Sequence, residues 1–268
     1  MGLFSNKKKL CPICGNPTPR LLATKIDGTP ICGDCNAKID LPQGGMDGMT
    51  IDKFQNYLSL YEANRNLLHT FTETYSYTFG FLAGVIVLDT THRMFRLNNL
   101  DNSWVFEAAN LKSFRILEDS RVLYEGTLGA LKYRESDVPE RVNAMSFQIS
   151  QYMMQRREYE RMKERERQDR EEGKNVNASI HYRPADLPVP FRHFHVELEL
   201  DHPYWKTHKW QFDGPIFSTT CPSIDSYLSD YNKKVEDLHM LALNLMQILN
   251  PEAQEVTVGS NWNGGFGQ

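Results

Sequence analysis

The sequence of 268 residues has no long apolar run. Its longest apolar stretch, FLAGVIVL from Phe81 to Leu88, has the length of a strand, whereas a membrane-spanning helix needs about 18 consecutive apolar residues. The opening stretch MGLFSNKKKLC has no apolar core of the kind found in secretory signals, and Asn6 stands where a myristoylation motif requires Ser or Thr. We therefore expect a cytoplasmic protein with no transmembrane segment.

The chain also has no strong excess of charge of one sign. Its 30 basic and 34 acidic side chains leave a net charge of −4, which gives no overall attraction to nucleic acid or to an anionic membrane. The sequence lacks a Gly-rich phosphate loop, a G-x-S-x-G nucleophile motif and an H-E-x-x-H metalloprotease motif. These absences favour a protein that is not an enzyme.

Cysteine is scarce, but four of the five cysteines fall within one short segment. Cys11 and Cys14 form one C-x-x-C pair, Cys32 and Cys35 form a second, and 17 residues lie between the pairs. This spacing predicts one structural zinc ion per chain, because four thiolates suit a closed tetrahedral Zn²⁺ shell. A rubredoxin-type iron site would use the same ligands. A closed shell leaves no position for water, so zinc catalysis is not expected.

The residues around the cysteines predict a small finger over residues 8–42. Gly15 can adopt the positive φ that often ends a C-x-x-C turn, and Asp27-Gly28 is a strong hairpin signal. A short helix is expected after Cys35. This order of elements is that of a treble-clef or zinc-ribbon finger, and such a finger is expected to unfold without its metal.

Residues 50–70 follow a Gly-rich linker and have a helical period, with Thr50 as the expected N-cap. From residue 73 to residue 135 the period changes to two, and short polar turns separate the apolar segments. Because the loops are too short for crossovers, these segments predict antiparallel strands.

The pattern of the last half of the chain predicts a charged helix, further strands, an amphipathic helix and a tail. Residues 139–175 form a helix that begins apolar and becomes almost entirely charged, with acids and bases at helical spacing. Residues 190–250 resume with strands and end in an amphipathic helix, in which Leu238 and Leu245 lie on one face. Residues 251–268 form a Gly- and Asn-rich tail, for which we expect flexibility.

Two stretches resemble known families. VFEAANLKSFRILEDSRVLYEG resembles bacterial pleckstrin-homology-like domains, and CPICGNPTPRLLATKIDGTPICGDC resembles an N-terminal cysteine domain of unknown function on uncharacterised bacterial proteins. The resemblance implies an α+β fold: a small zinc finger plus an antiparallel pleckstrin-homology-like β-sandwich. The charged helix would be an insertion in this sandwich, and the C-terminal helix would cap it. Neither family implies an activity.

The function expected from these features is that of a non-catalytic zinc-binding adaptor. Its finger and pleckstrin-homology-like module would bind a protein partner or, as a second expectation, a lipid. The alternative is a nucleic-acid-associated zinc-finger factor, which the acidic balance of the chain disfavours; its binding residues would be the basic residues of the finger, Lys7, Lys8, Lys9, Arg20 and Lys25. The third hypothesis is a hydrolase with a second metal site at His193 and His195, which share one face of an expected strand.

Overall fold

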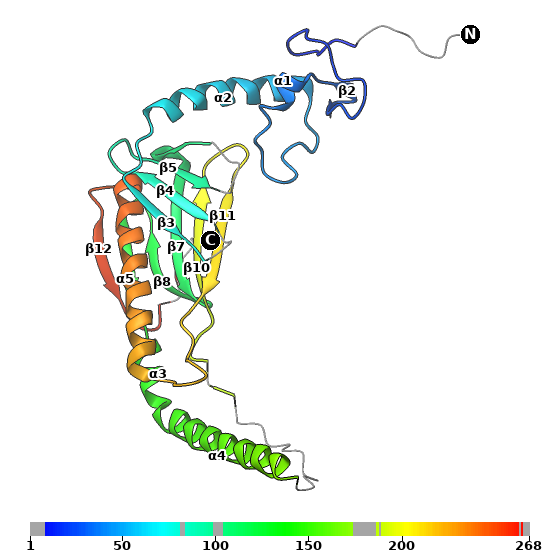
Figure 1. Cartoon of the computed structure of the whole chain (residues 1–268). Coiled ribbons are helices and arrows are strands. Elements are labelled where there is room, and N and C mark those ends of the chain that lie inside the picture. The colour runs from blue at the N-terminus through cyan, green and yellow to red at the C-terminus, as the bar shows by residue number, and fades with distance from the viewer. Residues whose placement is uncertain are drawn as a thin grey trace.

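The computed structural model describes residues 9–80, 84–98, 104–173, 186–187, 189–262 and 264. In this part of the chain the fold is mixed α and β with antiparallel sheets, as the sequence predicted. Figure 1 shows the four-cysteine segment at one end of the molecule, two sheets in the middle and a projecting helix at the other end. None of the helices described is long and apolar enough to cross a membrane.

The four-cysteine segment, residues 9–42, is called the finger below. It contains the hairpin β1 (Lys25–Ile26) and β2 (Thr29–Pro30), followed by the short helix α1 (Gly33–Asn36). Asp27 and Gly28 both have positive φ, which confirms the predicted tight turn. The helix begins between the last two cysteines rather than after Cys35, because the Cys32 sulfur accepts the N–H of Cys35 and thus caps it.

The first sheet of the body is a four-stranded antiparallel meander. It runs in the order β3 (Tyr75–Thr78), β4 (Val85–Asp89), β5 (Met94–Asn98) and β6 (Phe106–Glu107). Leu88 pairs with Phe95, and both side chains are fully buried. A short turn at residues 90–93 joins β4 to β5, as the period-two pattern predicted.

The second sheet has six strands in the order β11-β10-β7-β8-β9-β12. A 3₁₀ turn (Ala108–Asn110) leads into β7 (Leu111–Glu118), β8 (Arg121–Gly126) and β9 (Ala130–Arg134). Strands β10 (His193–Leu200) and β11 (Thr207–Asp213) continue the sheet beyond β7, so this edge is completed by segments far apart in the sequence.

The tail differs from the sequence prediction. Residues 254–258 form strand β12 (Gln254–Val258), which pairs in parallel with β9, although we expected flexibility here and antiparallel pairing throughout. The side chains of β12 are mostly exposed. Backbone hydrogen bonds to a neighbouring strand therefore order this segment, and an apolar pattern is not needed to place it.

The final helix, α5 (Ile224–Leu249), packs against both sheets. It contacts β7, β8 and β9 of the six-stranded sheet and β4 of the other (Figure 1). Leu238 and Leu245 are buried on its inner face, as predicted. At its C-terminus the Arg93 guanidinium donates to the carbonyls of Ile248 and Leu249, each at 2.9 Å, which satisfies acceptors that the helix itself leaves free.

The helix predicted from residue 139 is divided in two. Helix α3 (Val138–Ala144) packs against α5, and α4 (Ser146–Glu171) begins immediately after Met145. Within the described residues, the first turns of α4 are anchored to the body: Ile149 and Tyr152 are buried, and the Tyr152 hydroxyl donates to the carbonyl of Thr219 at 2.8 Å. Beyond them α4 projects from the body (Figure 1).

Helix α2 (Ile51–Thr70) joins the finger to the body, and Thr50 caps it as predicted. Toward the finger, the Tyr57 hydroxyl accepts from the N–H of Asp40 and donates to the carbonyl of Lys38, both at 2.7 Å. Toward the body, the Asn64 amide donates to the Val105 carbonyl at 2.6 Å and accepts the Val105 N–H at 3.0 Å. These buried contacts hold the finger to the body through one helix.

Candidate metal centre

The structure brings the four predicted cysteines together. Their sulfur atoms all lie within 4.8 Å of one another. The closest pairs are Cys14 and Cys32 at 3.3 Å, Cys14 and Cys35 at 3.6 Å, and Cys11 and Cys35 at 3.8 Å. A tetrahedral ion with metal–sulfur bonds of about 2.3 Å would place its sulfurs about 3.8 Å apart. The arrangement can therefore hold one metal ion, and it contains no disulfide.

Two local structures aim the sulfurs inward. In the first C-x-x-C turn, the N–H of Gly15 donates to the Cys11 carbonyl at 2.9 Å, and Gly15 has a φ of 74°, as its predicted role requires. In the second, Cys32 is the N-cap of α1 and Cys35 lies within that helix. Each pair of ligands is thus positioned by a backbone turn of its own, and the β1–β2 hairpin brings the two turns together.

The electrostatics of the site favour a cation. Burial opposes ionisation of Cys11, but backbone N–H groups, among them those of Cys14 and Cys32, outweigh it and lower the pKa of Cys11 to about 6. Burial and the neighbouring cysteine sulfurs raise the pKa of Cys35. One thiolate is therefore readily formed, whereas further thiolates beside it need a positive charge to remain ionised.

The metal site lies in the small core of the finger. Cys11, Cys32 and Cys35 are buried together with Ile26 and Ile31, whereas Cys14 is exposed at the surface. Few other apolar side chains of the finger are buried. A metal ion would therefore supply a large share of the stability of this segment.

Within the described residues, the four cysteines are the one group whose ligand atoms converge in this way. The imidazole rings of His193 and His195 do share the outer face of β10, with centroids 6.2 Å apart. Nδ1 of His193 lies 3.2 Å from a carboxylate oxygen of Asp213. These two histidines are therefore neighbours, but among the described residues no third ligand joins them to form a metal site.

The basic residues of the finger are only partly described. Lys9, Arg20 and Lys25 are exposed, whereas Lys7 and Lys8 lie outside the described residues. Asp27 and Asp34 are exposed on the same finger, so the described surface carries acids as well as bases.

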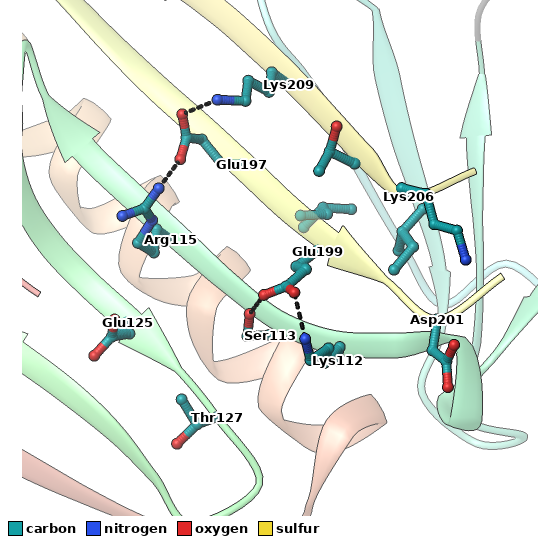
Figure 2. A pocket seen from close by; sticks show the side chains of 13 residues that line it. Lys112, Ser113, Arg115, Glu125, Thr127, Glu197, Glu199, Asp201, Lys206 and Lys209 are labelled. Carbon is teal, nitrogen blue, oxygen red and sulfur yellow. Dashed lines mark hydrogen bonds and ion pairs between the residues drawn. The ribbon is translucent and has the colours of Figure 1, made fainter. Parts of the chain in front are cut away.

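A groove of about 990 Å³ crosses the outer face of the six-stranded sheet. Figure 2 shows the Glu197 carboxylate between Arg115 and Lys209, at 2.5 and 2.9 Å, and the Glu199 carboxylate between Lys112 and Ser113. Burial opposes ionisation of Glu197, but the bonds from Lys209 and Arg115 outweigh it and lower its pKa. Glu197 and Glu199 are thus both paired with bases of the groove. This groove was not predicted, because its residues come from strands far apart in the chain.

The helix contacts of Tyr57 and Asn64 were also not predicted. The helical period of residues 50–70 did not indicate that Tyr57 and Asn64 would be buried, as both are. An asparagine on a helix gives little sign of burial by itself.

Comparisons with models of protein families, with curated proteins and with solved structures found no match to this chain.

Proposed function

We propose that this protein is a non-catalytic, zinc-dependent adaptor of the cytoplasm, in which the finger binds a protein partner and the body holds the finger in place. Zn²⁺ fits the four-thiolate set better than the other common divalent ions, which prefer oxygen or nitrogen ligands, and iron is the alternative metal. A closed set of four sulfur ligands serves structure rather than chemistry. Separate thiols of this kind are typical of reducing surroundings.

The observation that carries the proposal is the exposure of leucines on the finger. Leu21 is 84% exposed, Leu22 is fully exposed and Leu10 is 61% exposed, whereas Ile26 and Ile31 of the same finger are each 1% exposed. Leu22 also has a φ of 56°, an unusual conformation for a leucine. Neighbouring large apolar side chains in water are typical of a surface that a partner covers.

In this proposal the body is a rigid support that holds the finger. We propose that it is a variant of the pleckstrin-homology-like sandwich, since a four-stranded meander faces a second antiparallel sheet and a long C-terminal helix packs against both. In this variant β10 and β11 extend the second sheet beyond β7, and the tail adds β12. The contacts of Tyr57 and Asn64 would hold the finger at a fixed orientation to this body.

The proposal is tested by the double substitution L21D/L22D in the full chain. Partners would be captured by cross-linking in the native cell and identified by mass spectrometry. We expect one protein partner to be lost with L21D/L22D and with Cys14→Ser. It should be retained with Leu128→Asp, a control that alters a leucine of the body with 66% exposure. A partner retained by L21D/L22D, or lost equally with Leu128→Asp, would contradict the proposal.

A further inference from the structure

Helix α4 carries an unusual line of side chains on its solvent side. The line contains two apolar residues near the body and three arginines further out, and we call it the arginine stripe: Phe147, Met154, Arg157, Arg161 and Arg165. At about 100° per residue, these five positions fall within an arc of about 80° on the helix surface. Ile149 and Tyr152, which anchor α4, lie on the opposite side. The stripe therefore faces away from the body.

The two apolar residues of the stripe are far more exposed than is usual for their type. Phe147 is 76% exposed and Met154 is 71% exposed. The same arc of α4 holds Ser150 and Gln168 but no acidic residue; Glu158 and Glu164 lie about 20° outside its two edges. The stripe thus combines apolar and positively charged groups without a negative charge among them.

The three arginines of the stripe are also unpaired. Arg157, Arg161 and Arg165 are exposed and make no ion pair or side-chain hydrogen bond in the described part of the chain. Three of the nearby acids are engaged elsewhere, while Glu158 borders the stripe: Glu160 pairs with Arg156, Glu164 with Arg167 and Glu166 with Arg170. The acids lie at or beyond the borders of the stripe, so the stripe itself carries three positive charges although the helix as a whole is nearly neutral.

We propose that the arginine stripe is a docking surface for an anionic lipid membrane. The stripe is straight and about 27 Å long, so a flat surface could touch all five side chains at once. Phe147 and Met154 would enter the boundary between headgroups and acyl chains, and the arginines would contact lipid phosphates. A nucleic acid would engage the arginines but leave both apolar side chains in water, which makes it the less suitable occupant.

This inference is independent of the proposed function, because it concerns a different element at the opposite end of the molecule from the finger (Figure 1). Together the two would place a finger-bound partner at a membrane surface. Loss of the finger by Cys14→Ser should leave membrane binding unchanged, so failure of one proposal can be distinguished from failure of the other.

The test is sedimentation of the full chain with vesicles. We expect binding to vesicles of equal parts phosphatidylserine and phosphatidylcholine, and none to pure phosphatidylcholine. The variant R157Q/R161Q/R165Q should lower the partition coefficient by about 100-fold, which is about 3 kcal/mol at 1.4 kcal/mol per tenfold. Glutamine is a good helix former, so circular dichroism should show α4 unchanged.

The matched control is K163Q/R167Q/R170Q, which removes the same three positive charges from the other side of α4. We expect it to bind within about 3-fold of the unaltered chain, because charge within a few ångströms of the lipid dominates the attraction. The variant F147S/M154S should also bind more weakly, which a purely electrostatic contact would not show. Equal losses in the two charge variants, unaltered binding by R157Q/R161Q/R165Q, or binding to a duplex RNA with none to the vesicles would each overturn the proposal.

Discussion

The finger buries two isoleucines beside three of its cysteines, whereas the body buries aliphatic and aromatic residues from both sheets and from α5. The two regions must therefore be stabilised in different ways. Hydrophobic burial is sufficient for a domain the size of the body, but a segment as small as the finger needs a further source of stability. A bound metal ion would be such a source, and the four converging sulfur atoms provide its ligands.

The regions also differ in how they are joined to the rest of the chain. The body is closed by long-range pairing, because β10 and β12 return to strands formed much earlier in the sequence. The finger is joined to the body through α2. The Tyr57 hydroxyl bonds to the finger, while the Tyr57 ring packs on Trp104 and Tyr204 of the body, and Asn64 bonds to the body alone. We therefore expect changes in each region to leave the other folded, and the following experiments test this separation.

Removal of the metal should have the largest effect. A strong chelator should unfold the finger, because zinc binding contributes about 10–16 kcal/mol in comparable isolated fingers. Limited proteolysis should then cleave within residues 9–42 while the thermal transition of the body remains. Protection of the finger in the presence of the chelator would show that its few apolar contacts suffice.

Truncation in the core of the body should give the next largest effect. Leu238 on α5 is 4% exposed, and Leu238→Ala should lower the free energy of unfolding of the body by about 2–5 kcal/mol through lost burial and a cavity. Calorimetry would measure the change, and metal content would be the control. Loss of the metal in this variant would mean that the finger depends on the body.

Asn64→Ala tests the junction, which is the set of contacts that α2 makes with the finger and with the body. It leaves the buried N–H and carbonyl of Val105 without their partner, at a cost of about 2–4 kcal/mol for the two groups together. The matched control is Gln55→Ala, an exposed position on the same helix. Hydrogen exchange should show faster opening of α2 in Asn64→Ala alone, with the metal retained in both variants. Equal exchange in both would remove Asn64 from the account of the junction.

Acid should weaken the body through His202. Burial lowers the pKa of His202 to about 4, so the unfolded chain, in which its pKa is about 6.5, binds the proton more readily. Stability should therefore fall as the pH drops from about 6.5 to about 4, by up to about 3 kcal/mol from this residue. Thermal unfolding of His202→Gln should show a shallower pH dependence in this range. An unchanged slope would mean that other groups cause the acid sensitivity.

The smallest effect is expected on α4. Arg170 and Glu166 form an exposed ion pair at 2.6 Å, and such pairs contribute about 0–1 kcal/mol. Arg170→Ala should change the melting temperature of the body by no more than about 4 °C, as measured by circular dichroism. A larger decrease would show that this part of α4 supports the fold.

Local patterns in the sequence predicted much of this molecule. The C-x-x-C pairs identified Cys11, Cys14, Cys32 and Cys35, and the apolar stripe of α5 identified Leu238, because ligand spacing and helical periodicity are local properties. The tail that forms β12 was expected to be flexible, because strand pairing depends on partners that are distant in the sequence.

The junction and the groove were missed for the same reason. Asn64 meets Val105 and Glu197 meets Arg115 only after the strands have assembled, and nothing in their own neighbourhoods indicates these contacts. Likewise, the sequence alone does not tell which arginines of α4 form ion pairs, because this depends on the side-chain contacts in the folded chain.

The most direct test of the account is the metal content of two purified proteins measured by elemental analysis. The unaltered chain should contain one zinc ion per chain. Cys14→Ser, which removes one of four ligands, should contain almost none and should still show the cooperative melting of the body. Retention of one zinc ion by Cys14→Ser, or loss of the body's transition together with the metal, would contradict the division into a metal-dependent finger and a self-sufficient body.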